Sequence, residues 1–104
     1  MYIDAVVVPV PKKKLAAYRA MARKSGKVWR EHGALQYLEC VADDVKSGET
    51  VVFAYVVYKS RAHRDRVMKK VFSDKRLADM MDPKKLPFDG KRMFWGGFKP
   101  LVRV

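Results

Sequence analysis

The stretch VVFAYVVY, residues Val51–Tyr58, decides the fold, because it is rich in β-forming residues and carries no charge on either face. Successive side chains of a strand point to opposite faces of a sheet. In an antiparallel sheet with helices on one face and water on the other, a strand should alternate apolar and polar residues. This stretch does not alternate, so it predicts a sheet that is covered by helices on one face and by a second protein layer on the other.

The segments around this stretch predict the order β-α-β-β-α-β. Prolines end the first strand, apolar residues at spacings of three and four mark a long helix, and a polar loop over residues 43–49 makes a hairpin. We therefore expect one ferredoxin-like α+β domain over residues 1–104, with an antiparallel four-stranded sheet. The expected elements are strand Tyr2–Val10, helix Lys12–His32, strand Leu35–Val41, strand Val51–Tyr58, a helix after Ser60 interrupted at Ser73-Asp74, and a strand from about Lys91 to Val104.

Apolar residues on both faces of the strands also predict an assembly. Tyr2–Val10 carries only Asp4 as a charge, and two helices can cover only one face of its sheet. A second copy of the chain is the simplest second layer, because closed two-fold dimers are the commonest assembly. We expect a homodimer packed sheet to sheet.

Composition limits the size of the core, the cellular compartment and the relation of the protein to membranes. The 104 residues suffice for one moderate core, and the single cysteine, Cys40, excludes an intrachain disulfide, which is typical of a reducing cytoplasm. Asp4 interrupts the apolar start where a signal peptide needs an unbroken apolar core. The longest uncharged apolar run is far shorter than the roughly 20 residues of a spanning helix. We expect a cytoplasmic protein with no membrane partner.

The net charge of +12 has two interpretations. A basic surface attracts acidic partners such as nucleic acid, whereas a solvated basic surface has no partner. The Lys and Arg residues are dispersed, and no zinc-finger, helix-turn-helix or aromatic RNA-binding signature accompanies them. The pattern favours a solvated surface and disfavours nucleic acid without excluding it.

Three segments resemble a known family. They are YIDAVVVPVPKKKLAAYRAMA (2–22), EHGALQYLEC (31–40) and PFDGKRMFWGGF (87–98), and they are similar to the YbaA-like proteins, a small bacterial family of undetermined function. The resemblance implies the dimeric α+β barrel superfamily, which agrees with the two-faced burial inferred above. The loop at residues 43–49 departs from some relatives, because it is shorter than their acidic insertion.

The superfamily includes cofactor-free monooxygenases, haem-degrading enzymes, isomerases and ligand-sensing modules, so the fold does not settle activity. The frequent use of a cleft between sheet and helices in this superfamily implies where a site would lie, and we expect the protein to bind or transform a small organic molecule there. If the chain is an enzyme, a cofactor-free monooxygenase-like or isomerase-like reaction is the class implied. The alternative is a non-catalytic interaction module for an acidic partner.

Two residues are candidate catalysts, each with a structural alternative. Asp4 lies in an apolar strand, where burial could make it a general base, or where an ion pair with Lys91 or Arg92 could compensate its charge. His32 closes the apolar stripe of the long helix and could act as a base, but a His at a helix C-terminus is more often a cap. Two histidines and one cysteine without short spacing predict no metal site, and we expect no cofactor.

Most aromatic and Met side chains are expected in the core or at the dimer interface, and a minority to line a pocket for a flat apolar ligand. Glu39 is instead a candidate for an ion pair, and Cys40 for a small buried apolar residue. The candidate ligand-binding residues are Arg92, Trp95, Tyr55, Glu39 and Trp29.

The glycine-rich stretch LPFDGKRMFWGGFKP, residues 86–100, is not predicted to bind phosphate, because strand rather than helix follows its glycines. We expect Asp89-Gly90 to turn into the last strand. Gly96-Gly97 is expected to bend that strand by a bulge or to admit another backbone.

Overall fold

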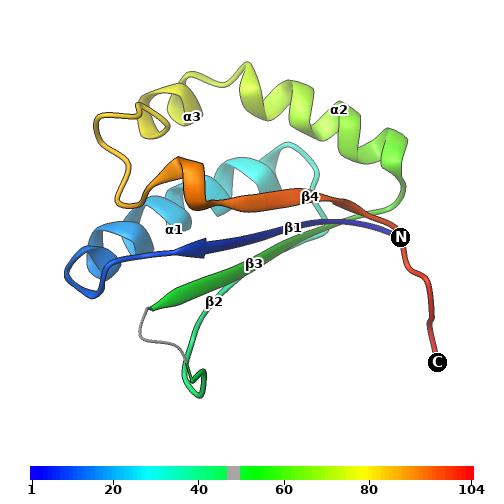
Figure 1. Cartoon of the computed structure of the whole chain (residues 1–104). Helices are drawn as coiled ribbons and strands as arrows, with labels where there is room; N and C mark the ends of the chain where they lie inside the picture. Colours follow the sequence, from blue (N-terminus) through cyan, green and yellow to red (C-terminus); the bar gives the residue numbers. More distant parts are fainter. Residues whose placement is uncertain (47–49) are drawn as a thin grey trace.

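The computed structural model describes residues 1–46 and 50–104 and contains a four-stranded antiparallel sheet with helices on one face (Figure 1). The strand order is β2-β3-β1-β4, so the split βαβ arrangement expected from the sequence is confirmed. The elements are β1 (Tyr2–Pro9), the 3-10 turn η1 (Lys12–Lys14), α1 (Leu15–Glu31), β2 (Gln36–Val41), β3 (Val51–Tyr58), α2 (Arg61–Phe72), α3 (Lys75–Met80), the 3-10 turn η2 (Gly90–Arg92) and β4 (Phe94–Phe98).

The last strand differs from the prediction. Asp89 caps η2 through a hydrogen bond from the Lys91 amide, so β4 begins only at Phe94, and it ends at Phe98, two residues before Pro100. Its register with β1 runs without an inserted residue, so the expected bulge at Gly96-Gly97 is wrong. Residues 47–49 of the expected hairpin loop lie outside the described residues.

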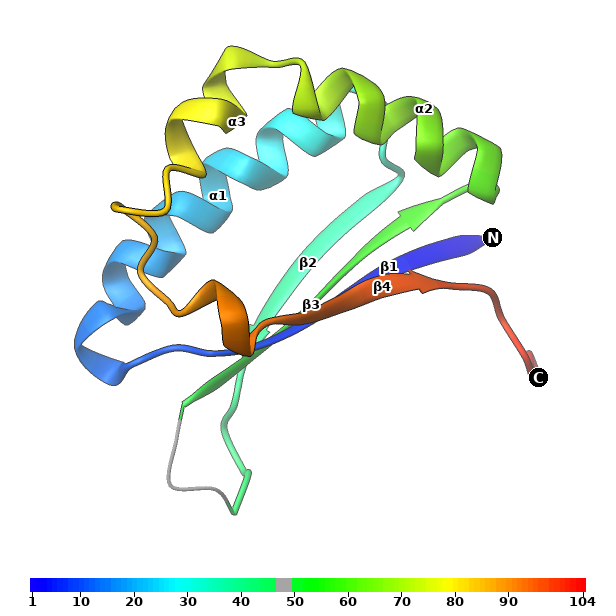
Figure 2. The same ribbon diagram turned by 45° about the horizontal axis from the view of Figure 1, so that its top comes forward.

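Helix ends follow local signals in the sequence. Gly33 adopts φ +113° after α1, a conformation that strains any residue with a side chain. Ser60 caps α2 by accepting a hydrogen bond from the His63 amide, and Asp74 caps α3 by accepting one from the Arg76 amide. Figure 2 shows that all three helices lie on the same side of the sheet.

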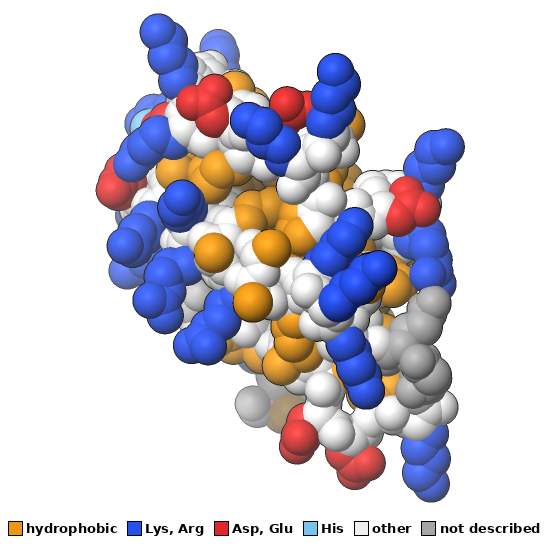
Figure 3. All heavy atoms as spheres, turned by 90° about the vertical axis from the view of Figure 1, so that its left-hand side faces the viewer, with side chains coloured by type: hydrophobic (Ala, Val, Ile, Leu, Met, Phe, Trp, Pro, Cys, Tyr) orange, Lys and Arg blue, Asp and Glu red, His pale blue; other side chains and the backbone are white. Residues whose placement is uncertain are grey.

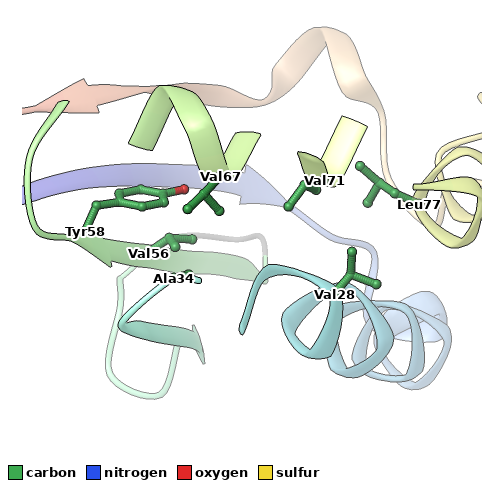
Figure 4. Packing of buried hydrophobic residues seen from close by; sticks show 7 residues of the cluster. All are labelled: Val28, Ala34, Val56, Tyr58, Val67, Val71 and Leu77. Carbon is green, nitrogen blue, oxygen red and sulfur yellow. The ribbon is translucent and has the colours of Figure 1, made fainter. Parts of the chain in front are cut away.

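The core lies between the sheet and these helices. Val56 and Tyr58 of β3 meet Val28 of α1 and Val67 and Val71 of α2 (Figure 4). A second buried cluster joins the other end of β1 and β3 to the first half of α1; its members are Val8, Val10, Tyr18, Ala22 and Val52. The sheet therefore buries one face within the chain.

The opposite face of the sheet carries no charged residue. We call it the uncharged face; it is formed by alternate residues of each strand, in the register that pairs Ala5 with Tyr55 and with Gly96. Large apolar side chains on it are exposed, including Phe94 at 59% and Phe53 at 45%. Its residues are Ile3, Ala5, Val7, Pro9, Gln36, Leu38, Cys40, Val51, Phe53, Tyr55, Val57, Phe94, Gly96 and Phe98.

Candidate functional site

A groove of about 750 Å³ lies between α1 and β2, at the edge of the sheet. Its walls are mainly apolar, with a few polar side chains, and its volume is typical of small-molecule sites. The lining residues are Leu15, Tyr18, Arg19, Ala22, Arg23, Gly26, Lys27 and Arg30 of α1, Tyr37, Leu38, Glu39, Cys40 and Val41 of β2, and Val52 of β3.

Glu39 is held in this groove by two tyrosines. The Tyr18 hydroxyl donates to one carboxylate oxygen, and the Tyr37 hydroxyl donates to the other at 2.5 Å. Burial, followed by the nearby Glu39, raises the pKa of both phenols above its ordinary value, so both remain protonated donors at neutral pH. The ion pair expected for Glu39 is replaced by this pair of hydrogen bonds within one chain.

Gly26 makes room for this arrangement. A Cβ at this position would lie 2.7 Å from Cδ1 and 2.9 Å from Cε1 of Tyr37, closer than van der Waals contact allows. The missing side chain therefore lets the Tyr37 ring lie against α1 with its hydroxyl directed at Glu39.

Cations line the rim of the groove. Arg30 donates through Nη1 to the carbonyls of Ala34 and Leu35, which joins the end of α1 to the start of β2. Arg19, Arg23 and Lys27 are exposed and form no ion pair with any residue in the described part of the chain. The groove thus combines an apolar wall, one carboxylate and three cations available to an anion.

A second polar arrangement is buried under α2. Asp4 is only 5% exposed; its Oδ2 accepts a hydrogen bond of 2.9 Å from Tyr58, whose oxygen accepts one of 3.0 Å from Trp29 Nε1. Burial raises the pKa of Asp4, and the Tyr58 hydrogen bond and the Arg64 charge only partly oppose this. Asp4 does not line the α1–β2 groove.

The cation beside Asp4 is Arg64 of α2, so the expected pairing with Lys91 or Arg92 is wrong. Arg64 Nε lies 3.6 Å from Asp4 Oδ1, beyond hydrogen-bond range, and neither atom has a hydrogen-bond partner among the described residues. Arg64 also donates to the Tyr2 hydroxyl at 3.0 Å and lies over the Tyr2 ring. These two side chains cover Gly97, so this glycine admits side chains where another backbone was expected.

His32 lies at the surface, at the end of α1. Its Nε2 is 2.8 Å from Asp74 Oδ2, and Asp74 also accepts a hydrogen bond from Arg76. Arg76 pairs in turn with Glu31 at 2.7 Å. His32 therefore joins α1 to α3, an arrangement that matches the capping alternative for this residue.

The other candidate residues are distributed over the molecule. Trp29 contacts both polar arrangements. The centroid of its ring lies 6.1 Å from that of the Tyr37 ring, and its Nε1 donates a hydrogen bond to the Tyr58 hydroxyl oxygen. Tyr55 lies on the uncharged face, Trp95 is half exposed on β4, and Arg92 is exposed in η2. Glu39 alone among the candidates lines the groove.

Sequence reasoning missed the tyrosines that hold Glu39 and the arginine beside Asp4. Tyr37 and Glu39 lie two residues apart in one strand, so the sequence already indicated that their side chains point to the same face of the sheet. Tyr18 and Arg64 reach their partners across 21 and at least 60 residues of sequence, and no local spacing reports such a contact.

Two further observations concern residues 1–46 and 50–104. They contain no cluster of three His, Cys, Asp or Glu side chains that could hold a metal ion. None of their helices is long and apolar enough to cross a bilayer.

The strand order and the layer of helices define a ferredoxin-like α+β protein. The chain belongs to the family described as proteins of unknown function, DUF1428, whose model matches residues 1–49 and 45–90. It is 39% identical over 115 residues to the uncharacterized protein YbaA of Escherichia coli K12, with 97% of each chain covered. The resemblance read from the three sequence segments is thereby confirmed.

Solved structures with little sequence identity share this fold. A putative antibiotic biosynthesis monooxygenase from Deinococcus radiodurans aligns with a TM-score of 0.69 at 14% identity, covering 100% of this chain and 96% of that one. A dimeric ferredoxin-like protein from an uncultured marine organism aligns with a TM-score of 0.68 at 6% identity, covering 99% and 96%. At such identities the likeness shows the fold alone.

Proposed function

We propose that the α1–β2 groove binds a small organic anion that also carries a hydrogen-bond donor. The observation that supports this most is the position of Glu39, fixed by Tyr18 and Tyr37 inside a mainly apolar groove that has cations at its rim. Polar groups that are fixed in advance and set in apolar surroundings are typical of small-molecule sites.

The donor inventory defines the ligand further. Both tyrosine hydroxyl protons are used on Glu39, so the Glu39, Tyr18 and Tyr37 side chains offer a ligand only acceptors, namely carboxylate and phenol lone pairs. A ligand hydroxyl or amine donates there. Its anionic group pairs with Arg19, Arg23 or Lys27 at the rim, where charge-assisted hydrogen bonds are strongest for Arg.

The proposal is tested by a thermal-shift screen of hydroxylated carboxylates and phosphates, followed by calorimetry on the hits. Glu39→Gln and the double variant Arg19→Gln/Arg23→Gln should each weaken binding roughly 10- to 100-fold, the usual cost of losing a charge-assisted hydrogen bond. Lys69→Gln/Lys70→Gln on α2, away from the groove lining, is the matched control and should bind normally. Hits that bind both groove variants within twofold of the wild type would reject the site.

The active form that we propose is a homodimer joined through the uncharged face. Phe53, Phe94 and Phe98 are exposed together on this one face, and exposed apolar side chains gathered on one face commonly mark a protein–protein contact. The marine protein with the same fold is described as dimeric, which supports this assembly.

Light scattering at micromolar concentration should therefore give the mass of two 12.0 kDa chains. Phe53→Lys should produce monomers, because it places a charge in the interface. Phe72→Lys changes a phenylalanine on α2 that is at least as exposed as Phe53, and it should leave the dimer intact. A wild-type monomer mass would contradict the assembly.

A second candidate function rests on the distribution of charge. Residues 12–31 carry eight Lys or Arg and one Glu, a net charge of +7 out of the total of +12. Figure 3 shows Lys and Arg side chains around an apolar area on one side of the molecule, with acidic side chains mainly toward the top and bottom of the view. If this surface binds nucleic acid, affinity for a single-stranded oligonucleotide should fall steeply between about 50 and 200 mM salt, whereas affinity that salt leaves unchanged would reject it.

A further inference from the structure

We propose that the anion bound in the α1–β2 groove is a nucleotide with at least two linked phosphates. The inference rests on the small-molecule site proposed above and names the class of its ligand. It assigns the phosphates to the row of cations formed by Arg19, Arg23 and Lys27, which we call the cation row, and the nucleoside to the groove interior beside Glu39.

The cation row follows one side of α1. Its members are four residues apart, so their backbone positions lie about 6 Å from one another and span about 12 Å along the helix axis. Each member comes directly after a buried residue that lines the groove; these three residues are Tyr18, Ala22 and Gly26. The row therefore borders the groove over about two turns of the helix.

No acidic side chain neutralises the cation row. Residues 12–30 contain no Asp or Glu, and no member of the row forms an ion pair within the described part of the chain. Arg76 on α3, by contrast, pairs with both Glu31 and Asp74. Like charges four residues apart on a helix repel one another and destabilise it. The row is thus a set of positive charges that a bound anion can neutralise.

The charge of the row exceeds what one simple anionic group can neutralise. A carboxylate can bind a single Arg through both of its oxygens, which leaves two cations of the row without a partner. A nucleoside monophosphate carries about two negative charges at neutral pH, still fewer than the cations of the row. A second linked phosphate adds a further negative charge, and its oxygens lie beside those of the first. A diphosphate is therefore the smallest phosphate group that matches the row.

The interior of the groove favours a nucleoside as the organic part of the ligand. Both oxygens of Glu39 accept hydrogen bonds from tyrosines, and each oxygen has a second lone pair for a ligand donor. Ribose hydroxyls and a base amine supply such donors, while a flat base packs on the apolar wall. A hydrocarbon chain on a diphosphate would instead remove water from the carboxylate without replacing its hydrogen bonds.

The test compares probes that differ in one chemical group. AMP, ADP, inorganic pyrophosphate and geranyl diphosphate are titrated into the protein by calorimetry, without divalent metal ions, which would compete for the phosphates. ADP should bind roughly tenfold or more tightly than AMP, because its second phosphate adds charge-assisted hydrogen bonds. It should exceed pyrophosphate by a similar factor, because only ADP places donors beside Glu39. Geranyl diphosphate should bind more weakly than ADP.

Two exposed lysines of α1 provide a matched pair of variants. Lys27→Gln removes a cation from the row and should weaken ADP binding roughly tenfold. Lys24→Gln removes the same charge three residues away, at a position that does not line the α1–β2 groove, and should bind ADP within about twofold of the wild type. Glu39→Gln should weaken ADP binding roughly tenfold without weakening that of pyrophosphate, because the nucleoside is the part that contacts Glu39.

The inference is overturned if ADP does not bind, or if it binds no more tightly than AMP, pyrophosphate or geranyl diphosphate. Equal losses in Lys24→Gln and Lys27→Gln also overturn it, because they would assign the binding to the overall charge of α1. After any of these results, a hydroxylated carboxylate that depends on Glu39 would still support the groove as a small-molecule site. ADP binding that neither Glu39→Gln nor Lys27→Gln changes would reject this inference and would place the nucleotide outside the groove.

Discussion

The Tyr58 hydroxyl lies 2.9 Å from Asp4 Oδ2 and donates a hydrogen bond to it inside the core. This contact joins β1 to β3 through side chains, in addition to the backbone ladder that pairs Tyr2 with Tyr58. It also places a carboxyl group where burial disfavours its charge. The stability of the fold therefore depends on the protonation of Asp4.

The first prediction concerns this dependence. The pKa of Asp4 is raised in the folded state, so its contribution to stability is complete below the unfolded pKa near 3.8 and is lost as pH rises through the folded pKa. The wild type should therefore lose stability relative to Asp4→Asn between about pH 3.5 and 7, in urea unfolding. Asp79→Asn on exposed α3 controls for a lost surface charge. A wild-type advantage that grows with pH would contradict the direction of the shift.

Trp29 provides the second prediction. Trp29→Phe removes the hydrogen bond to Tyr58 and part of a ring that packs on Phe72, and should lower the free energy of unfolding by about 1–3 kcal/mol. Trp95→Phe makes the same change at a half-exposed edge position and should cost less than about 0.5 kcal/mol. Equal losses in both variants would show that the Tyr58 contact contributes nothing.

The third prediction concerns Gly97. A Cβ there would lie 2.3 Å from the Tyr2 hydroxyl and 2.4 Å from Arg64 Nη2, so Gly97→Ala should destabilise by about 1–3 kcal/mol through overpacking. Gly90→Ala adds a methyl group to open space and is the control. Chemical denaturation of the two variants side by side makes the comparison, and a neutral Gly97→Ala would mean that Tyr2 and Arg64 move aside freely.

The fourth prediction concerns the ion pairs between α1 and α3. Hydrogen bonds from Arg76 and then His32 hold the pKa of Asp74 well below its usual range. Its contribution is present above pH 3.8 and disappears as pH falls through the lowered pKa. Asp74→Asn keeps a capping side chain but loses the charge, so it should be clearly destabilising at pH 6 and less destabilising at pH 2, where part of the contribution has been lost. A loss of the same size at both pH values would assign the effect to the cap.

The sequence predicted the architecture well, because the apolar residues of β1, α1 and β3 are spaced according to the face that each of these elements buries in the fold. It predicted side-chain partners poorly. Asp4 was expected to pair with Lys91 or Arg92, but Gly97 occupies the position opposite Asp4 and leaves space that Arg64 enters from α2. Such a contact depends on a missing side chain and on how a helix crosses the sheet.

Cys40 shows a different limit. A lone strand cysteine is usually buried, yet here it is exposed on the uncharged face. Residue type indicates only how often such a residue is buried, whereas the structure of one chain shows what that chain itself covers. Glu39 and Tyr55 differ in this respect. Both carboxylate oxygens of Glu39 accept hydrogen bonds from tyrosines of the same chain, whereas Tyr55 lies on the uncharged face, which no helix of the chain covers.

The basic helix α1 has an energetic consequence. Eight like charges within residues 12–31 repel one another, and the one acid among them, Glu31, is already paired with Arg76. Folding concentrates this repulsion along η1 and α1, so screening ions should raise the melting temperature, and a multivalent anion should raise it more than chloride at equal ionic strength. An anion bound at the groove rim would therefore reduce the repulsion among these positive charges. This reduction would add to the affinity that its direct contacts provide.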